Sequence, residues 1–521
     1  MTARPSAPGT GRARCRVVGP GLALVLGLVT LPLTVSPAAA VSTDQSYWVA
    51  PGGSVVFRGH GYGHGHGMSQ YGAQGAAKQG LTYRQIVGFY YPGTTWSTVT
   101  GQVRVLVTSD TSSDLVVGRV PGMTLRDLGR SRTYTLPSPA GMKRWRITVG
   151  ARNKSVVDYL TGSWHRWKPG GQATLTGDGQ FAAPTPMTLY TPSGSRTYRG
   201  ALRSASPTAG TAARDTVNVL SMDDYVRGVI PTEMPASWHP EAVKAQAVAA
   251  RTYATWSRSQ YPSRYYQICD TTSCQVYGGV GAEDPRSNAA VADTARQILT
   301  YAGKPAFTQF SSSSGGWTSA GSVPYLPAKA DPYDGFSGNP VHDWTFTLSV
   351  VRIQNAYPQV GTLRRIHVTR RDGNGEWNGR VWTLVLDGTR SDVTVSGDSF
   401  RSRLGLRSTW FTVDPTPIIS RWTSLGGNAS PLGAVASRQY GLPGGAVQQF
   451  TKGRIFYARA IGARELYGPI LTAYRARGGV SSGLGYPTSG ITAVSGGQRA
   501  TFQGGIISWT RSTDKVSVTL S

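Results

Sequence analysis

The sequence is poor in charge, methionine and cysteine. Only 15% of its 521 residues are charged, and it contains seven Met and three Cys. This composition excludes a coiled coil or a long helical bundle, and three cysteines are too few for a disulfide-dense scaffold. Gly (66), Pro (32), Tyr (25) and Trp (14) are abundant instead. Disordered chains are poor in aromatic residues, so we expect a folded, turn-rich α+β protein dominated by strands.

Several catalytic motifs are also missing. The chain has no Walker loop, no Rossmann fingerprint and no His-Glu-x-x-His motif. Residues 310–318 (FSSSSGGWT) contain four consecutive serines, but the Gly-x-Ser-x-Gly pattern of a serine nucleophile and an adjacent base are absent. We therefore interpret this run as a glycine turn that lines a polar groove.

The longest apolar run lies at the N-terminus. Residues 21–33 (GLALVLGLVTLPL) follow four arginines and precede Pro37-Ala-Ala-Ala40. This order predicts a secretory signal peptide over residues 1–40. An uncleaved anchor is the alternative, but the run is short for a membrane span and contains Pro32. Since no later stretch approaches 18 apolar residues, we expect a secreted, wall-associated protein without stable membrane insertion.

The charge balance is strongly basic. Lys and Arg number 53 against 26 Asp and Glu, which gives a formal charge of +27. A basic exported protein favours anionic cell-wall polymers as partners and argues against nucleic acid. The alternative is that the charge only keeps the protein soluble. The sequence leaves the oligomeric state open.

Local patterns predict a mixture of strands and helices. An Ala-rich helix is expected over Pro240–Trp256, with Pro240 in the first turn, where proline is tolerated. Other helices are expected over residues 74–79, 83–89 and 287–299. Strands are expected where β-branched and aromatic residues alternate with polar ones, over residues 103–108, 144–149, 188–191, 364–368, 381–386 and 392–395.

The C-terminal part repeats itself. Phe450, Gly453 and Ile455 recur as Phe502, Gly505 and Ile507, at a spacing of 52 residues. A fixed period of this length indicates one small structural unit used twice. Residues 416–521 carry 11 Lys and Arg but two acidic residues, and we interpret them as a separate binding module.

Glu233 is the candidate catalytic acid. It lies between Pro231 and Pro235, and Pro235 favours an extended Met234, so we expect Glu233 on a rigid loop before the Ala-rich helix. Its neighbours in sequence are apolar or small. A carboxyl that loses its water keeps its proton to higher pH, as a general acid must. An exposed loop glutamate is the alternative from position alone.

Two further groups invite interpretation. His60, His64 and His66 stand between alternating glycines without a nearby acidic or cysteine ligand, so we favour close backbone packing over a metal site. Cys269 and Cys274 form the remaining cysteine pair of an exported chain, which favours a disulfide.

Longer motifs resemble the SpoIID/LytB family. The segment from Tyr225 to Trp238 (YVRGVIPTEMPASW) and the segment from Ala242 to Tyr253 (AVKAQAVAARTY) carry the resemblance most clearly. Residues 198–200, 274–279, 312–318, 331–334 and 400–411 add to it. The resemblance covers about residues 101–413. The tail resembles LGFP repeats, most clearly in Leu484-Gly-Tyr-Pro487.

One segment departs from the family's order. The Gly-His-Gly-x-Gly-Met-Ser-Gln block normally follows the Leu-Gly-Leu-Arg-Ser block, yet here it occupies residues 63–70. We interpret residues 41–100 as a circularly permuted end of the SpoIID domain, 101–413 as its main part and 416–521 as LGFP-like repeats. Residues 57–72 should then pack beside residues 395–413, with His64 and Gln70 near Glu233.

The resemblance implies a lytic transglycosylase that acts on peptidoglycan glycan strands, with Glu233 as its acid and base. It also implies substrate binding by His64, Gln70, Gln246, Arg251, Ser312, Gly315, Gly316 and Asp331. Some family members bind zinc near the cysteine motif, but this chain offers only the two cysteines there, so we expect a disulfide and no cofactor. A wall-binding or amidase-enhancing protein and a muramidase that uses water are the alternatives.

Overall fold

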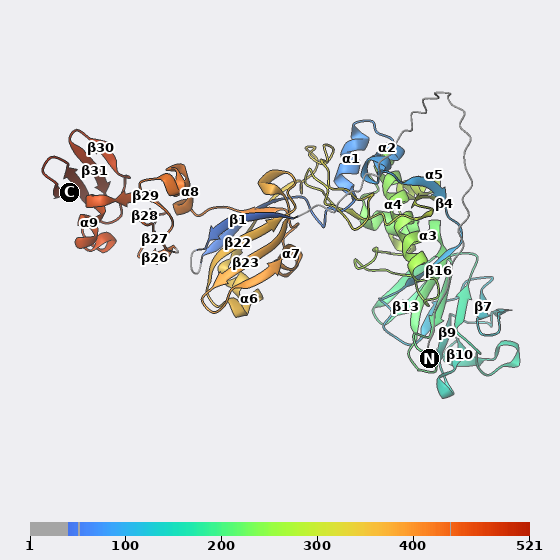
Figure 1. The fold of residues 1–521 in the computed structure, drawn as a ribbon. Helices are drawn as coiled ribbons and strands as arrows, with labels where there is room; N and C mark the ends of the chain where they lie inside the picture. Colours follow the sequence, from blue (N-terminus) through green and yellow to red (C-terminus); the bar gives the residue numbers. More distant parts are fainter. Residues whose placement is uncertain (1–39, 50–52, 438) are drawn as a thin grey trace, which may run out of the picture. The chain divides into compact units, whose positions relative to one another are not determined.

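The computed structural model describes residues 40–49, 53–437 and 439–521. The predicted signal peptide, apart from Ala40, lies outside the described residues. The described chain is a mixed α+β protein rich in strands (Figure 1), which confirms the predicted fold class. Within these ranges, no helix is both long enough and apolar enough to cross a membrane.

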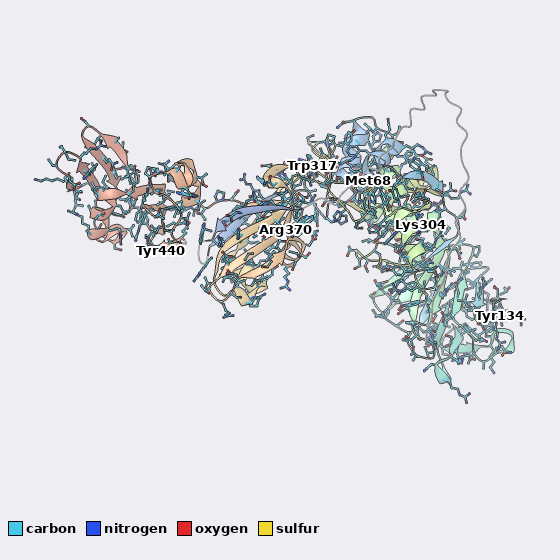
Figure 2. The ribbon with its side chains drawn as sticks, viewed as in Figure 1. Met68, Tyr134, Lys304, Trp317, Arg370 and Tyr440 are labelled. Carbon is cyan, nitrogen blue, oxygen red and sulfur yellow. A yellow bond between two sulfur atoms is a disulfide. The ribbon has the colours of Figure 1, made fainter. Side chains whose placement is uncertain are left out.

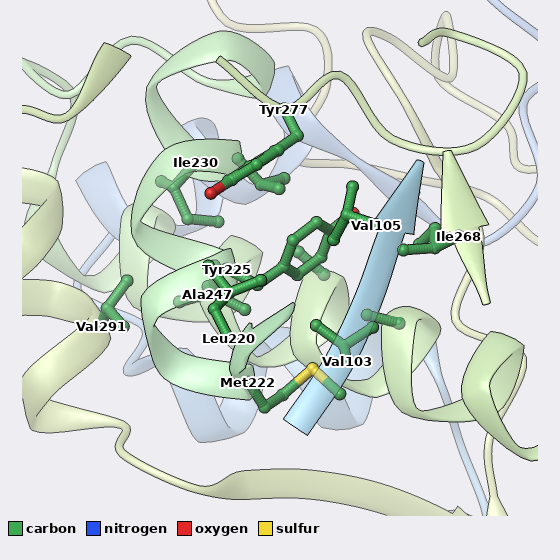
Figure 3. Close-up of a cluster of buried hydrophobic side chains, with 14 of the residues drawn as sticks. Val103, Val105, Leu220, Met222, Tyr225, Ile230, Ala247, Ile268, Tyr277 and Val291 are labelled. Carbon is green, nitrogen blue, oxygen red and sulfur yellow. The ribbon is translucent and has the colours of Figure 1, made fainter. Parts of the chain in front are cut away.

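The largest hydrophobic core is formed by two sheets and the helices packed on them. The first sheet has the strand order β17-β5-β16-β15-β12-β7-β8, and the second has the order β11-β10-β9-β6-β13-β14. In Figure 3, Val103 and Val105 of β5 lie beside Tyr225 of the helix α3. The bounds are β5 (Gln102–Leu106), β6 (Leu115–Gly118), β7 (Thr124–Asp127), β8 (Arg132–Thr135), β9 (Arg144–Val149), β10 (Ser155–Leu160), β11 (Trp164–Trp167), β12 (Gly179–Ala182), β13 (Met187–Thr191), β14 (Gly194–Tyr198), β15 (Ala201–Ala205), β16 (Asp215–Ser221) and β17 (Ile268–Cys269).

The Ala-rich helix is the centre of this core. It forms α4 (Pro240–Gln260), and its small side chains let α3 (Met222–Glu233) and α5 (Pro285–Asp293) pack closely against it. The predicted helix over 287–299 was wrong in its second half. The helix α5 ends at Asp293, Arg296 takes a left-handed φ of 63°, and β18 (Gln297–Tyr301) pairs with β4 (Thr95–Thr98) and β19 (Lys304–Pro305).

The Gly/His-rich segment packs where its proposed permutation requires. The strand β2 (Ser54–His60) lies between β21 (Asp343–Ser349) and β25 (Phe411–Val413), with Gly59 opposite Phe411. The predicted packing of residues 57–72 beside residues 395–413 is therefore confirmed. The permutation itself stays a prediction.

Two helices follow this segment. The strand β3 (Met68–Ser69) runs parallel to β20 (Phe310–Ser311), and α1 (Gln70–Lys78) and α2 (Tyr83–Tyr90) come after it. The helix α1 begins four residues before the predicted start, because the Ser69 hydroxyl accepts a hydrogen bond from the Gly72 N–H and caps the helix.

A third sheet has its own core. Its order is β1-β22-β23-β24, formed by β1 (Val41–Trp48), β22 (Leu363–Arg371), β23 (Val381–Gly388) and β24 (Val393–Ser396). The helices α6 (Val350–Ala356) and α7 (Gly397–Leu404) pack against it (Figure 1). Phe57 of β2 belongs to the same core, so the Gly/His-rich segment is anchored in this sheet.

The C-terminal tail consists of one unit used twice, as the 52-residue period predicts. Each unit is a helix followed by a four-stranded antiparallel meander. Two isolated bridges, Val435 with Phe450 and Pro487 with Phe502, keep the same spacing. The bounds are α8 (Pro417–Ser424), β26 (Tyr440–Leu442), β27 (Gly445–Gln449), β28 (Gly453–Ala458), β29 (Gly462–Tyr467), α9 (Gly468–Ala476), β30 (Thr492–Val494), β31 (Gly497–Phe502), β32 (Gly505–Thr510) and β33 (Lys515–Leu520).

Candidate active site

Glu233 is the last residue of α3. Ser221 caps the start of this helix by accepting a hydrogen bond from the Asp224 N–H, and Met234 then leaves it in an extended conformation, as Pro235 requires. The extended Met234 was predicted correctly. The prediction that Glu233 lies on a loop was wrong. Pro231 lacks an N–H and so removes one hydrogen bond from the helix. The Met234 N–H still bonds to the Ile230 carbonyl and completes the last turn, which includes Glu233.

The Glu233 side chain opens into a pocket of about 310 Å³. We call this cavity the Glu233 pocket. Its wall combines the Gly/His-rich segment, α4, the loop after β17 and the residues around β20. The lining residues are His64, Glu233, Tyr253, Thr272, Ser273, Cys274, Gln275, Val276, Gln309 and Phe310.

A disulfide shapes one side of this pocket. Cys269 and Cys274 are joined in the structure. The chain turns back within this short loop, and the Val276 N–H then donates a hydrogen bond of 3.2 Å to Glu233 Oε1. Sequence reasoning singled out the cysteines but missed the loop residues that follow them. The short spacing of the two cysteines could have indicated the turn, because a disulfide over so few residues forces the chain to fold back.

The pocket favours a protonated carboxyl. Burial raises the pKa of Glu233, and the single hydrogen bond from Val276 opposes this shift. The sequence predicts the same direction from the apolar neighbours. Among the residues that line the described pocket, Glu233 is the one carboxylic acid. The site therefore offers one proton-transfer group in a polar cavity.

His64 faces Glu233 across the pocket as a neutral imidazole. Burial lowers the pKa of His64 to about 3, with His66 and Arg380 adding to the effect. Its Nδ1 accepts a hydrogen bond of 2.9 Å from the His66 N–H, and the two rings stack with centroids 4.9 Å apart. An imidazole fixed in this way can orient a polar group but carries no charge at neutral pH.

The alternating glycines let this segment approach the serine run. Gly61 has a φ of 73°, and a Cβ there would lie 2.7 Å from the Ser313 carbonyl oxygen. Tyr62 and Ser313 exchange backbone hydrogen bonds beside it. The prediction of close backbone packing is confirmed, and it explains how a segment near the N-terminus brings His64 to Glu233.

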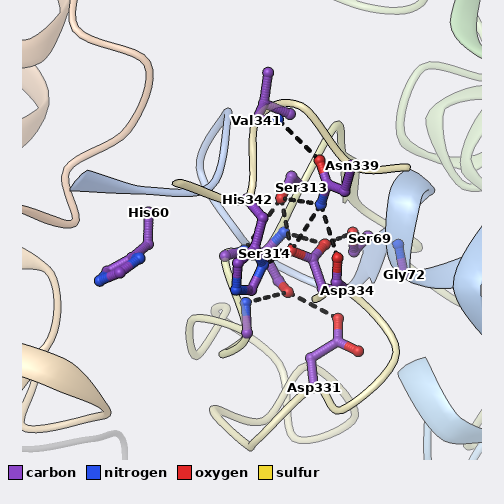
Figure 4. A network of polar contacts seen from close by, with 12 residues as sticks. His60, Ser69, Gly72, Ser313, Ser314, Asp331, Asp334, Asn339, Val341 and His342 are labelled. Carbon is purple, nitrogen blue, oxygen red and sulfur yellow. Dashed lines mark hydrogen bonds and ion pairs between the residues drawn. The ribbon is translucent and has the colours of Figure 1, made fainter. Parts of the chain in front are cut away.

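A second buried carboxylate holds the serine run in place. Asp334 is fully buried and accepts hydrogen bonds from six donors (Figure 4). Burial acts to raise the pKa of Asp334, but the hydrogen bonds from His342, Ser69 and Ser313 outweigh it and the pKa is lowered. The donors are Ser69 Oγ, Ser313 Oγ, Ser314 N, Gly315 N, Asn339 Nδ2 and His342 Nδ1.

Four residues expected at the substrate take part in this loop framework. The Ser312 carbonyl accepts from the Tyr71 N–H, and the Gly316 carbonyl accepts from the Asp331 N–H. Gly315 donates its N–H to Asp334. Asp331 is 2% exposed and accepts from Tyr90 and Ser314. None of the four lines the Glu233 pocket, and their contact with substrate stays a prediction.

Three more expected substrate residues lie apart from the pocket. Arg251 is fully buried and donates to Asp223 at 2.7 Å and to the Val291 carbonyl at 3.2 Å, so it ties α4 to α3 and α5. Gln246 is also fully buried in α4. Gln70 opens α1 and is 8% exposed. None of the three lines the Glu233 pocket, and their contact with substrate stays a prediction.

Comparison with known families agrees with the geometry. The family model for Stage II sporulation protein, SpoIID, matches residues 211–301. This part of the chain is similar to SpoIID. The matched span contains Glu233, α4 and the disulfide loop, but not His64 or Phe310, which complete the pocket from outside it. Residues 432–482 and 484–520 match the LGFP repeat.

Individual relatives cover parts of the chain. An amidase enhancer of Bacillus subtilis (strain 168) is 45% identical over 130 residues, which are 24% of this chain and 17% of that protein. A stage II sporulation protein D of Bacillus amyloliquefaciens is 33% identical over 224 residues, which are 38% of this chain and 61% of the relative. The chain thus spans less than two thirds of the length of either relative.

Proposed function

We propose that this protein is a secreted lytic transglycosylase that acts on peptidoglycan in the cell wall. The enzyme cleaves the bond between N-acetylmuramic acid and N-acetylglucosamine. One observation carries the proposal. Among the described residues that line the polar Glu233 pocket, Glu233 is the one carboxylic acid, and its pKa is raised. Ordinary glycosidases need a second carboxylate to activate water or to attack the sugar. A transglycosylase needs one.

The reaction balances with Glu233 alone. The protonated carboxyl gives its proton to the oxygen that leaves C1 of the muramic acid, and the C1–oxygen bond breaks. The 6-hydroxyl of the same sugar then bonds to C1 and releases its proton to the Glu233 carboxylate. A 1,6-anhydro ring forms, no water is consumed and Glu233 is protonated again.

The surrounding residues support this cycle. Burial raises the pKa of Glu233, which favours the protonated form that a general acid needs. The Val276 N–H stabilises the carboxylate that forms after proton transfer. His64 is neutral and would orient a sugar hydroxyl without competing for the proton.

The LGFP tail completes the proposal as a wall-binding module. Its 11 Lys and Arg against two acidic residues suit anionic wall polymers. Deletion of residues 416–521 should lower retention of the protein on isolated cell walls. Unchanged retention would contradict this role.

Product analysis tests the activity. Purified protein is incubated with intact and with peptide-stripped peptidoglycan, and the ends of the released fragments are identified by mass spectrometry. The proposal predicts 1,6-anhydro ends. Reducing ends would indicate a muramidase that uses water.

The name of the amidase enhancer among the relatives favours a second candidate. In that case the protein would bind the wall and stimulate an amidase without cutting glycan strands. Stimulation of an amidase that persists fully in Glu233→Gln, together with the absence of glycan cleavage by the wild type, would support it.

A further inference from the structure

A second pocket adjoins the Glu233 pocket through His64. It has a volume of about 330 Å³, and its lining includes His64, His66, Arg380, Trp382, Asp398 and Thr409. We call this cavity the Trp382 pocket. His64 lines both cavities, so the two lie next to each other at this residue. The family match ends at residue 301, well before Trp382.

The position of Trp382 suits a sugar ring. It lies on β23 and is 42% exposed, although its neighbour Val381 is buried in the core of the third sheet. An exposed indole at the mouth of a polar cavity is a common feature of a ligand site rather than of a core. Arg370, which is labelled in Figure 2, lies on the neighbouring strand β22. Its guanidinium carbon is 5.9 Å from the centroid of the Trp382 indole.

The polar groups of the cavity suit hydroxyls. Arg380 is 3% exposed, and its Nη2 donates to the Ser314 carbonyl at 2.8 Å. Its Nη1 is buried and has no hydrogen-bond partner among the described residues. Asp398 offers acceptors from the first turn of α7. Among the lining residues, the cation Arg380 and the anion Asp398 offset each other, and Arg370 adds a second cation beside the indole.

We propose that the Trp382 pocket is a second glycan subsite, in which an uncharged hexosamine of the bound strand stacks on the Trp382 indole. The C–H face of a pyranose ring is apolar, whereas its hydroxyls and amide are polar, so an indole beside donors and acceptors matches both. This inference rests on the proposed function, because it assumes that the Glu233 pocket takes the neighbouring sugars of the same strand.

Binding of N-acetylglucosamine oligomers tests the subsite without requiring cleavage. Calorimetry on the full chain compares a disaccharide with a hexasaccharide, in wild type, Trp382→Ala, Trp382→Tyr and Trp96→Ala. Trp96 is a matched control, since it is 37% exposed and lines neither pocket. Thermal melting checks that each variant is folded.

Trp382→Ala should bind the hexasaccharide about tenfold more weakly, which corresponds to roughly 1.4 kcal/mol, and the disaccharide unchanged. Trp382→Tyr keeps a ring and should remain close to wild type, as should Trp96→Ala. Equal hexasaccharide binding by wild type and Trp382→Ala would overturn the subsite. If Trp382→Ala does not fold, a wild type that binds the disaccharide and the hexasaccharide with equal affinity would overturn the subsite as well.

The outcome is separable from that of the proposed function. Loss of cleavage in Glu233→Gln together with unchanged hexasaccharide binding by Trp382→Ala would refute the subsite. It would leave the proposed transglycosylase activity standing. Weakened hexasaccharide binding by Trp382→Ala, in a protein that never yields anhydro ends, would keep the subsite and refute the transglycosylase.

Discussion

Glu233 is a half-buried carboxyl and Asp334 a fully buried one, and their surroundings shift the two pKa values in opposite directions. Asp334 accepts six hydrogen bonds and has a lowered pKa. Glu233 accepts one among the described residues, has a raised pKa and borders a pocket. Burial alone does not mark a catalytic acid. What distinguishes the candidate is burial with few hydrogen bonds beside space for a substrate.

Replacement of Glu233 should give the largest effect. Glu233→Gln keeps the size of the side chain but removes the transferable proton, so we expect release of glycan fragments to fall by about 10²–10⁴-fold. Glu376→Gln is a matched control, because Glu376 is exposed and lies outside the Glu233 pocket. Fragment release at the wild-type rate from Glu233→Gln would contradict the assignment of Glu233, rather than Asp334, as the catalytic acid.

Replacement of Asp334 should instead act on stability. Asp334→Asn leaves buried donors and His342 without their anion, so we expect the free energy of unfolding to fall by about 3–5 kcal/mol. Glu233→Gln should change it by less than about 1 kcal/mol, since the amide buries no charge. Denaturant unfolding measures both. Equal stabilities of Asp334→Asn and wild type would show that the network is not what holds the serine run.

Asp331, a third carboxyl, should make the stability of the fold depend on pH. Burial and the charge of Asp334 raise the pKa of Asp331 to about 6. A carboxyl whose pKa is higher in the folded state binds more protons when folded, so its contribution to stability falls as the pH rises from about 4 to about 6. Relative to Asp331→Asn, the wild type should lose roughly 3 kcal/mol over this window. Parallel stability curves for the two proteins would contradict this assignment.

Reduction of the disulfide should have the smallest effect. In the chain-entropy model, a loop this short stabilises the fold by roughly 2 kcal/mol. The reduced protein should therefore remain folded, with a weaker activity, because the loop after Cys274 carries the Val276 N–H that contacts Glu233. Thiol labelling of the native protein should find Cys269 and Cys274 unreactive. Two freely reactive thiols, or zinc bound in stoichiometric amount, would refute the disulfide.

Much of the fold followed from local patterns. The Ala-rich helix, the strand 144–149 and the repeated tail unit were predicted because each depends on residues close in sequence. The strand over 297–301 was missed, since its pairing with residues 95–98 is a contact between distant segments. Local propensity cannot register such a partner.

The site was predicted in part for the same reason. Glu233 and the Gly/His-rich segment were recognised, and the resemblance brought them together across the chain. Arg251, Gln246 and Asp331 were expected at the substrate; the structure buries all three, and their contact with substrate stays a prediction. A motif names the residues that matter without saying whether they contact a ligand or hold the fold. Trp382 carried no sequence signal, because its role depends on a cavity between separate segments.

Digestion of peptide-stripped peptidoglycan in water labelled with heavy oxygen tests the central claim most directly. If Glu233 acts alone and the sugar's own hydroxyl closes the ring, the new ends are 1,6-anhydro and contain none of the label. Labelled reducing ends would show that water attacks C1, and would contradict a reaction carried by one carboxyl.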